Sequence, residues 1–97
     1  MSDDFFAPPP FKPDEALQRL QRELRALGLT EREGRFERRG QPIARVALDG
    51  AELKAARVRQ PARTPQWQER VIKDSAALRD FVAELKRELA RWGDRDE

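Results

Sequence analysis

Every second residue on either side of the centre of residues 42–58 is apolar, at positions 44, 46, 48, 51, 53 and 55, which is the two-residue period of a half-buried β-strand. Asp49 and Gly50 interrupt the alternation at its centre. Asp-Gly favours a two-residue type I′ turn, because both central residues of that turn take positive φ. The stretch therefore predicts a β-hairpin, around which the rest of the chain is organised.

This hairpin sorts its side chains onto two faces. A bend at its centre pairs Val46 with Leu53 on an apolar face, which Leu48 shares. Arg45 then lies opposite Lys54 on the other face, where two neighbouring positive charges are tolerable only in water. We expect one buried face and one open face.

A first helix is predicted for residues 13–27, where leucines recur at spacings of three and four. Pro13 suits the first helical position, and Gly28 suits the left-handed residue that follows a helix. The apolar stripe consists of Leu17, Leu20, Leu24 and Leu27. Two heptads are too few for a coiled coil, so this stripe is expected to pack into a core.

A second helix is predicted for residues 76–92, capped by Asp74 or Ser75 and ended by Gly93. Glu84 is expected on its solvent-facing side. Its apolar side consists of Leu78, Phe81, Val82, Leu85, Leu89 and Trp92. Burying this side cannot offset the conformational entropy of ordering the helix alone, so the helix needs a sheet to pack on.

The stretch between the first helix and the hairpin contains a polar connector, residues 30–34, and a short edge strand, residues 35–39. A two-residue turn after this strand would place Phe36 on the open face. A three-residue loop at residues 38–40, with Gly40 in a left-handed bulge position, would bury Phe36 instead. We therefore predict the three-residue loop.

Together these elements predict an α+β fold with a three- or four-stranded antiparallel meander and two helices packed on one face. Residues 59–66 form a loop, and residues 67–73 are the candidate fourth strand. The single domain covers residues 13–93. A Pro- and Phe-rich tail, residues 1–12, and an acidic end, residues 94–97, are expected to be disordered.

The composition lacks most of the residue types that act as catalytic nucleophiles, general bases or metal ligands. The chain has no Cys, His, Tyr or Asn, and its only hydroxyl groups belong to Ser2, Ser75, Thr30 and Thr64. No phosphate-binding glycine motif or metal-ligand spacing is present. We therefore predict no enzyme, no cofactor, no metal and no small-molecule substrate. The longest apolar runs are three residues and the N-terminus is acidic, so we expect a cytoplasmic protein without a membrane partner.

Positive charge concentrates in the sheet region. Residues 35–73 hold ten Lys and Arg against four Asp and Glu, whereas both flanking regions are net negative. The candidate binding residues are Arg45, Lys54, Arg57, Arg59, Arg63, Trp67 and Arg70. Guanidinium groups attract phosphates and an indole can stack on an unpaired base. A solvent-facing Trp67 beside Arg57 and Arg70 would favour this surface, and a Trp67 buried under the second helix would count against it.

The order helix, three strands, helix resembles the topology of double-stranded-RNA-binding domains. Those domains carry basic residues at the start of the second helix. Here Lys73 is followed by Asp74 at that place, so the resemblance does not extend to the binding residues.

Three functional hypotheses follow. The leading one is a non-enzymatic module that binds another protein, or self-associates, through the open face or an edge of its sheet. The alternative is nucleic-acid binding through the arginine-rich face and Trp67. The third places function in the tail, whose aromatic residues are Phe5, Phe6 and Phe11.

Overall fold

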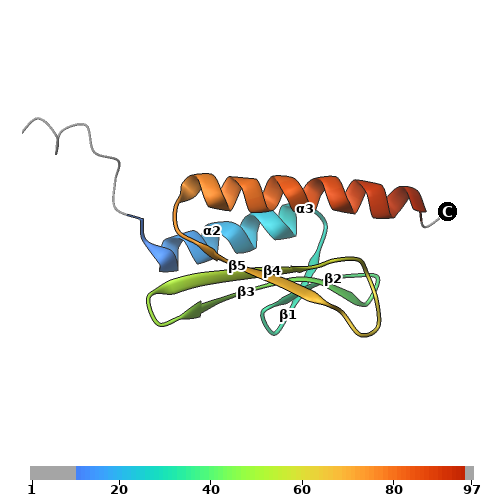
Figure 1. Ribbon diagram of the computed structural model, residues 1–97, viewed down its shortest axis with the longest axis horizontal. Helices are drawn as coiled ribbons and strands as arrows, with labels where there is room; N and C mark the ends of the chain where they lie inside the picture. Colours follow the sequence, from blue (N-terminus) through green and yellow to red (C-terminus); the bar gives the residue numbers. More distant parts are fainter. Residues whose placement is uncertain (1–10, 96–97) are drawn as a thin grey trace, which may run out of the picture.

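The computed structural model describes residues 11–95, which form two helices and one five-stranded antiparallel sheet. The strands follow one another in the order β1-β2-β3-β4-β5 (Figure 1). The elements are α2 (Pro13–Ala26), β1 (Thr30–Arg32), β2 (Arg35–Arg38), β3 (Gln41–Asp49), β4 (Glu52–Val58), β5 (Trp67–Ile72) and α3 (Ser75–Arg95). The predicted α+β meander is confirmed, with the fourth strand present and one further strand at the opposite edge.

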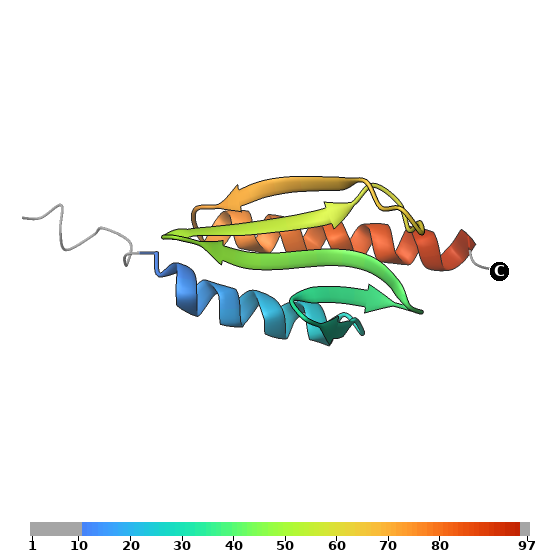
Figure 2. The same ribbon diagram turned by 90° about the horizontal axis from the view of Figure 1, so that it is seen from below.

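Both helices lie side by side on one face of the sheet, with α2 against β3 and β4 and α3 against β5. Figure 2 views the molecule from below, from the side of the sheet that the helices leave uncovered, with strands in front of α3. We call this uncovered side the open face. An antiparallel sheet tolerates such an arrangement because alternate side chains face core and water.

Helix α2 follows its sequence signals closely. Pro13 occupies the first turn together with Asp14 and Glu15, whose charges complement the positive end of the helix dipole. At the other end Gly28 takes φ +91°, and its N–H donates to the carbonyl of Arg25 at 2.9 Å. The predicted left-handed ending is confirmed, with the helix one residue shorter than predicted.

Helix α3 starts as predicted and ends later. The Asp74 carboxylate accepts a 2.7 Å hydrogen bond from the N–H of Ala77, which makes Asp74 the cap. The predicted end at Gly93 is wrong, because the helix continues to Arg95 and Gly93 has no positive φ. Glycine ends a helix only where the backbone turns left-handed, and here it does not.

The central hairpin has the predicted faces but a different register. Asp49 pairs with Glu52, so the turn residues are Gly50, with φ +65°, and Ala51. A positive φ at the first central residue only is the pattern of a type II′ turn, which requires glycine there. The pairing is shifted by two residues, so Val46 faces Ala55. A shift of two preserves the faces, because side chains alternate with period two.

The predicted three-residue loop between β2 and β3 is wrong. Arg39 and Gly40 form a two-residue turn with φ +56° and +81°, the signs of a type I′ turn. The register then slips within the ladder: Phe36 pairs with Ala44 and the residue after it with Pro42, which leaves Ile43 as an extra residue. This β-bulge turns Phe36 toward the helices despite the tight turn.

Strand β1 occupies residues that the sequence predicted as a connector. Thr30–Arg32 pairs with β2 through a tight turn at Glu33 and Gly34, where φ is +53° and +81°. All three residues of β1 are exposed, so no apolar alternation marks the strand. The edge of the sheet is therefore β1 rather than β2.

Most of the core lies between the sheet and the two helices. Val58 pairs with Trp67 and therefore belongs to the open face, yet it is fully buried. The fully buried large side chains are Phe36, Phe81, Leu20, Leu24, Ile43, Leu53, Ile72, Leu78, Leu85 and Val58. Leu48 was expected in this core but is 39% exposed near the hairpin turn. Phe11 packs partly buried against the core, whereas Phe5 and Phe6 lie outside the described residues.

Candidate interaction surface on the open face

The structure divides the predicted binding residues between the two faces of the sheet. The register of β3 and β4 puts Arg45 and Lys54 on the open face, as predicted. Arg57 pairs with Ala44 and therefore shares the face covered by the helices. Arg70 belongs to that same face, where its guanidinium meets α3. The seven residues therefore do not form one surface.

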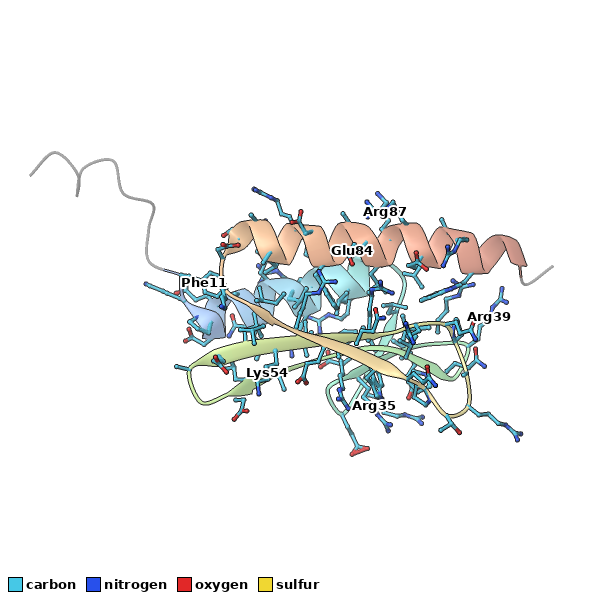
Figure 3. All side chains as sticks on the ribbon, in the orientation of Figure 1. Phe11, Arg35, Arg39, Lys54, Glu84 and Arg87 are labelled. Atoms are coloured by element: carbon cyan, nitrogen blue, oxygen red, sulfur yellow. The ribbon has the colours of Figure 1, made fainter. Side chains whose placement is uncertain are left out.

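Arg57 and Arg70 serve as ion-pair partners of α3. The Arg70 guanidinium donates two hydrogen bonds to the carboxylate of Glu84, at 2.8 and 3.1 Å, and lies over the ring of Phe81. The Nε of Arg57 lies 3.6 Å from the same carboxylate. Glu84, expected on the solvent-facing side of its helix, instead points toward the sheet (Figure 3). The three residues form a tether between sheet and helix.

The neighbouring arginines keep the carboxyl group of Glu84 ionised. The hydrogen bonds from Arg70 lower the pKa of its carboxyl below the ordinary value of 4.5, against the opposing effect of partial burial. The positive charges of Arg70, Arg57 and Arg87 lower it further. Glu84 is therefore firmly ionised near neutral pH, and its single negative charge is shared between two sheet arginines.

Arg59 and Arg63 are exposed on the loop between β4 and β5. The loop is closed by a backbone hydrogen bond from Arg59 to Gln66 at 3.1 Å. A shallow hollow of about 390 Å³ lies in it, lined by Arg59, Gln60, Ala62, Thr64 and Gln66. Arg59 is the one charged residue among the described residues that line this hollow, so the hollow is a weak candidate for a binding site.

Trp67 takes neither of its two predicted positions. It begins edge strand β5 on the open face, half-buried, with the guanidinium of Arg45 4.6 Å above its ring. Arg45 also lies 4.0 Å from Glu69. This cluster crosses β4 above Ala56, which is fully buried although it belongs to the open face. Trp67 and Arg45 thus form a partly exposed indole–guanidinium surface.

The cross-strand register brings three arginines into one row. Arg32 pairs with Arg35 and Arg35 pairs with Arg45, across strands β1, β2 and β3. We call these three residues the arginine row. Arg45 has Glu69 and Trp67 beside it, but among residues 11–95 neither Arg32 nor Arg35 has an ion-pair partner. Figure 3 shows Arg35 extending from the open face into solvent.

A concave region adjoins the row. It measures about 440 Å³ and lies between the turn that joins β1 to β2 and the middle of the sheet. Its charged lining residues are Glu33, Arg35, Arg45, Lys54 and Glu69. We call it the open-face hollow. Three cations and two carboxylates around one concavity can accept both an anionic group and hydrogen-bond donors.

Lys54 borders this hollow while remaining engaged elsewhere. Its ammonium group donates to the carboxylate of Asp49 at 2.9 Å. This hydrogen bond, and after it the attraction between the two opposite charges, lowers the pKa of Asp49 and raises that of Lys54. Lys54 is therefore a weaker candidate for ligand contact than the unpaired arginines.

The sequence did not single out Arg32 and Arg35, because the row exists only once β1 pairs with β2. A glycine follows Glu33 between two short polar stretches, and this was the available signal for a turn. Because β1 has no apolar positions, the sequence offers no reason to predict a strand before this turn.

Within residues 11–95 neither helix combines the length and apolarity needed to cross a bilayer, and no three acidic residues gather as a possible metal site. Comparisons of the chain with models of protein families, with curated proteins and with solved structures each find no match. Function is therefore inferred from the chemistry of the open face.

Proposed function

We propose that the protein is a non-enzymatic binding module and that the open face of its sheet binds a negatively charged macromolecule. The arginine row carries this proposal. Like charges directly opposite one another destabilise a sheet. Arg35 has an arginine on both neighbouring strands and no carboxylate partner among the described residues. An anionic partner would supply the missing counter-charge.

The open face suits this role better than the edges of the sheet. Strand β1 is three residues long and carries Glu31 and Arg32, and exposed β5 residues include Glu69. Short, charged edge strands discourage the addition of a further strand. Backbone pairing with a partner is therefore less favoured than contact through side chains of the face.

Electrostatics also favour a different molecule over a second copy. Two chains meeting face to face through this region would bring two arginine rows together, and like charges across an interface oppose association. We therefore expect a monomer, with the partner contributing carboxylates or phosphates.

The test is to titrate the ¹⁵N-labelled full chain with an acidic peptide and with short oligonucleotides, following amide chemical shifts. We expect shifts concentrated in β1, β2 and β3, and at least a tenfold loss of affinity in R32Q/R35Q. The matched control R19Q/R22Q removes two exposed arginines from α2, on the opposite side, and should bind like the unaltered chain. Absence of binding at low salt, or shifts confined to the helices, would refute the proposal.

A further inference from the structure

We infer that the ligand of the open face is single-stranded nucleic acid, with its phosphates along the arginine row and an unpaired base beside Trp67. This inference rests on the proposed function and narrows it. Three observations support it: the direction of the row, the indole–guanidinium surface, and the mixed charge of the hollow.

The row is a line of charge that leads to an aromatic ring. Neighbouring strands are about 4.8 Å apart, so the three arginines span roughly 10 Å across the sheet. The same cross-strand line continues from Arg45 through Ala56 to Glu69, and Trp67 stands two residues along β5 from Glu69. A groove of positive charge beside a stacking ring is the usual means of holding a single strand.

The guanidinium of Arg45 already lies over the ring of Trp67, with 4.6 Å between guanidinium carbon and ring centroid. Unpaired bases stack on aromatic rings and on guanidinium planes alike. Trp67 is partly exposed, so part of this indole–guanidinium surface is open to a ligand. In a duplex the bases are stacked on one another and closed to such contacts. A single strand therefore uses this surface and a duplex does not.

The carboxylates of the hollow argue against an acidic protein partner. Glu33 and Glu69 line the same concavity as Arg35 and Arg45. They would repel the side chains of an acidic peptide, whereas they can accept hydrogen bonds from the exocyclic amino group of a base. At about 440 Å³ the hollow lies within the size range of small-ligand sites. A base with an amino group, cytosine or adenine, is the best match.

The experiment measures fluorescence anisotropy of the full chain with labelled 12-nucleotide strands of cytosine or thymine, a 12-base-pair duplex and a polyglutamate peptide, at two salt concentrations. We expect micromolar binding of the cytosine strand, several-fold weaker binding of the thymine strand, and at least tenfold weaker binding of duplex and peptide. In R32Q/R35Q two phosphate contacts are lost, so the slope of log K against log salt should become shallower by about 1.4.

R19Q/R22Q again serves as the matched control and should leave the affinity and the salt slope unchanged. A second variant, Trp67→Phe, keeps an aromatic ring over β4 and should bind the cytosine strand only a few-fold more weakly. If the peptide binds through Arg32 and Arg35 and the strands do not, the inference is overturned while the proposed function stands. If no anion binds, both are overturned.

Discussion

Arg70 of β5 and Glu84 of α3 form a two-point ion pair, with both carboxylate oxygens accepting from the guanidinium. Such charge-assisted fork geometry is stronger than a single neutral hydrogen bond. Because both side chains are partly exposed, solvent screens part of the attraction. We expect E84Q and R70Q each to lower the free energy of unfolding by about 1–2 kcal/mol.

A double-mutant cycle measured by urea denaturation isolates the pair. The double variant should lose about 1 kcal/mol less than the sum of the single losses, since the second substitution has no intact pair left to remove. The control is the pair Glu88–Arg91, three residues apart on α3 with Arg91 well exposed, whose coupling should not exceed about 0.5 kcal/mol. Additive losses at Glu84 and Arg70 would contradict the tether.

Stability should fall in acid partly because of Glu84. Its pKa is lower in the folded chain than its ordinary value of 4.5, so ionised Glu84 stabilises the fold above that pH. The stabilisation is lost as the pH falls from about 4.5 through the lowered pKa of the folded state. We expect the unfolding midpoint of the unaltered chain to drop more steeply between pH 5 and pH 3 than that of E84Q. Parallel curves would exclude this contribution.

Ile43 and Leu48 both depart from strict alternation along β3, in which Ile43 would share the open face with Arg45 and Leu48 the buried face with Val46. Ile43 is 1% exposed because the bulge gives it a place in the core, whereas Leu48 is 39% exposed. We expect Ile43→Ala to cost about 2–4 kcal/mol of unfolding free energy and Leu48→Ala less than about 1 kcal/mol. Thermal or urea denaturation of the two variants provides the measurement, and similar losses would contradict the bulged register.

The helices could be predicted from sequence because their signals are local. Proline at the first position, a leucine repeat and Gly28 fix α2 within one residue, and Asp74 marks the start of α3. The faces of the central hairpin could also be predicted, since alternation alone decides them. Its register could not, because two turn types fit the residues around Gly50 equally well and differ by a shift of two.

The candidate site depends on pairing between distant segments, and this limits what the sequence reveals. In the sequence, Arg57 and Arg70 look like surface cations. Only the pairing of β4 with β5 and the packing of α3 on the sheet bring them to Glu84. Arg32 and Arg35 look unremarkable until β1 joins the sheet. No pattern along the sequence encodes a row perpendicular to the strands, because the two pairings β1–β2 and β2–β3 decide which residues belong to it.

Two glycines that sequence reasoning treats alike should respond in opposite ways to alanine. Gly93 lies inside α3 without positive φ, and a methyl group there would meet Arg38 at an ordinary contact distance of 3.5 Å. Gly93→Ala should therefore raise the unfolding free energy by about 0.5 kcal/mol through helix propensity. Gly28 has φ +91°, so Gly28→Ala should lower it by about 1 kcal/mol. A destabilising Gly93→Ala would mean that the helix ends where the sequence suggested.

The arginine row predicts a variant that is more stable than the unaltered chain. Arg35 lies between Arg32 and Arg45 and forms no ion pair with a described residue, and each directly opposite like charge costs a few tenths of a kcal/mol. Arg35→Gln removes both repulsions while keeping a polar side chain of moderate length. Its unfolding free energy should rise by about 0.2–1 kcal/mol at low ionic strength.

This gain should shrink as salt is added, because ions screen repulsion between exposed charges. Arg22→Gln on α2, where no like-charge pair crosses a strand, is the matched control and should leave stability unchanged within about 0.5 kcal/mol. Urea denaturation at two salt concentrations measures both variants. A loss of stability in Arg35→Gln would show that Arg35 has a structural partner, and would remove the main reason for expecting an anionic ligand at this face.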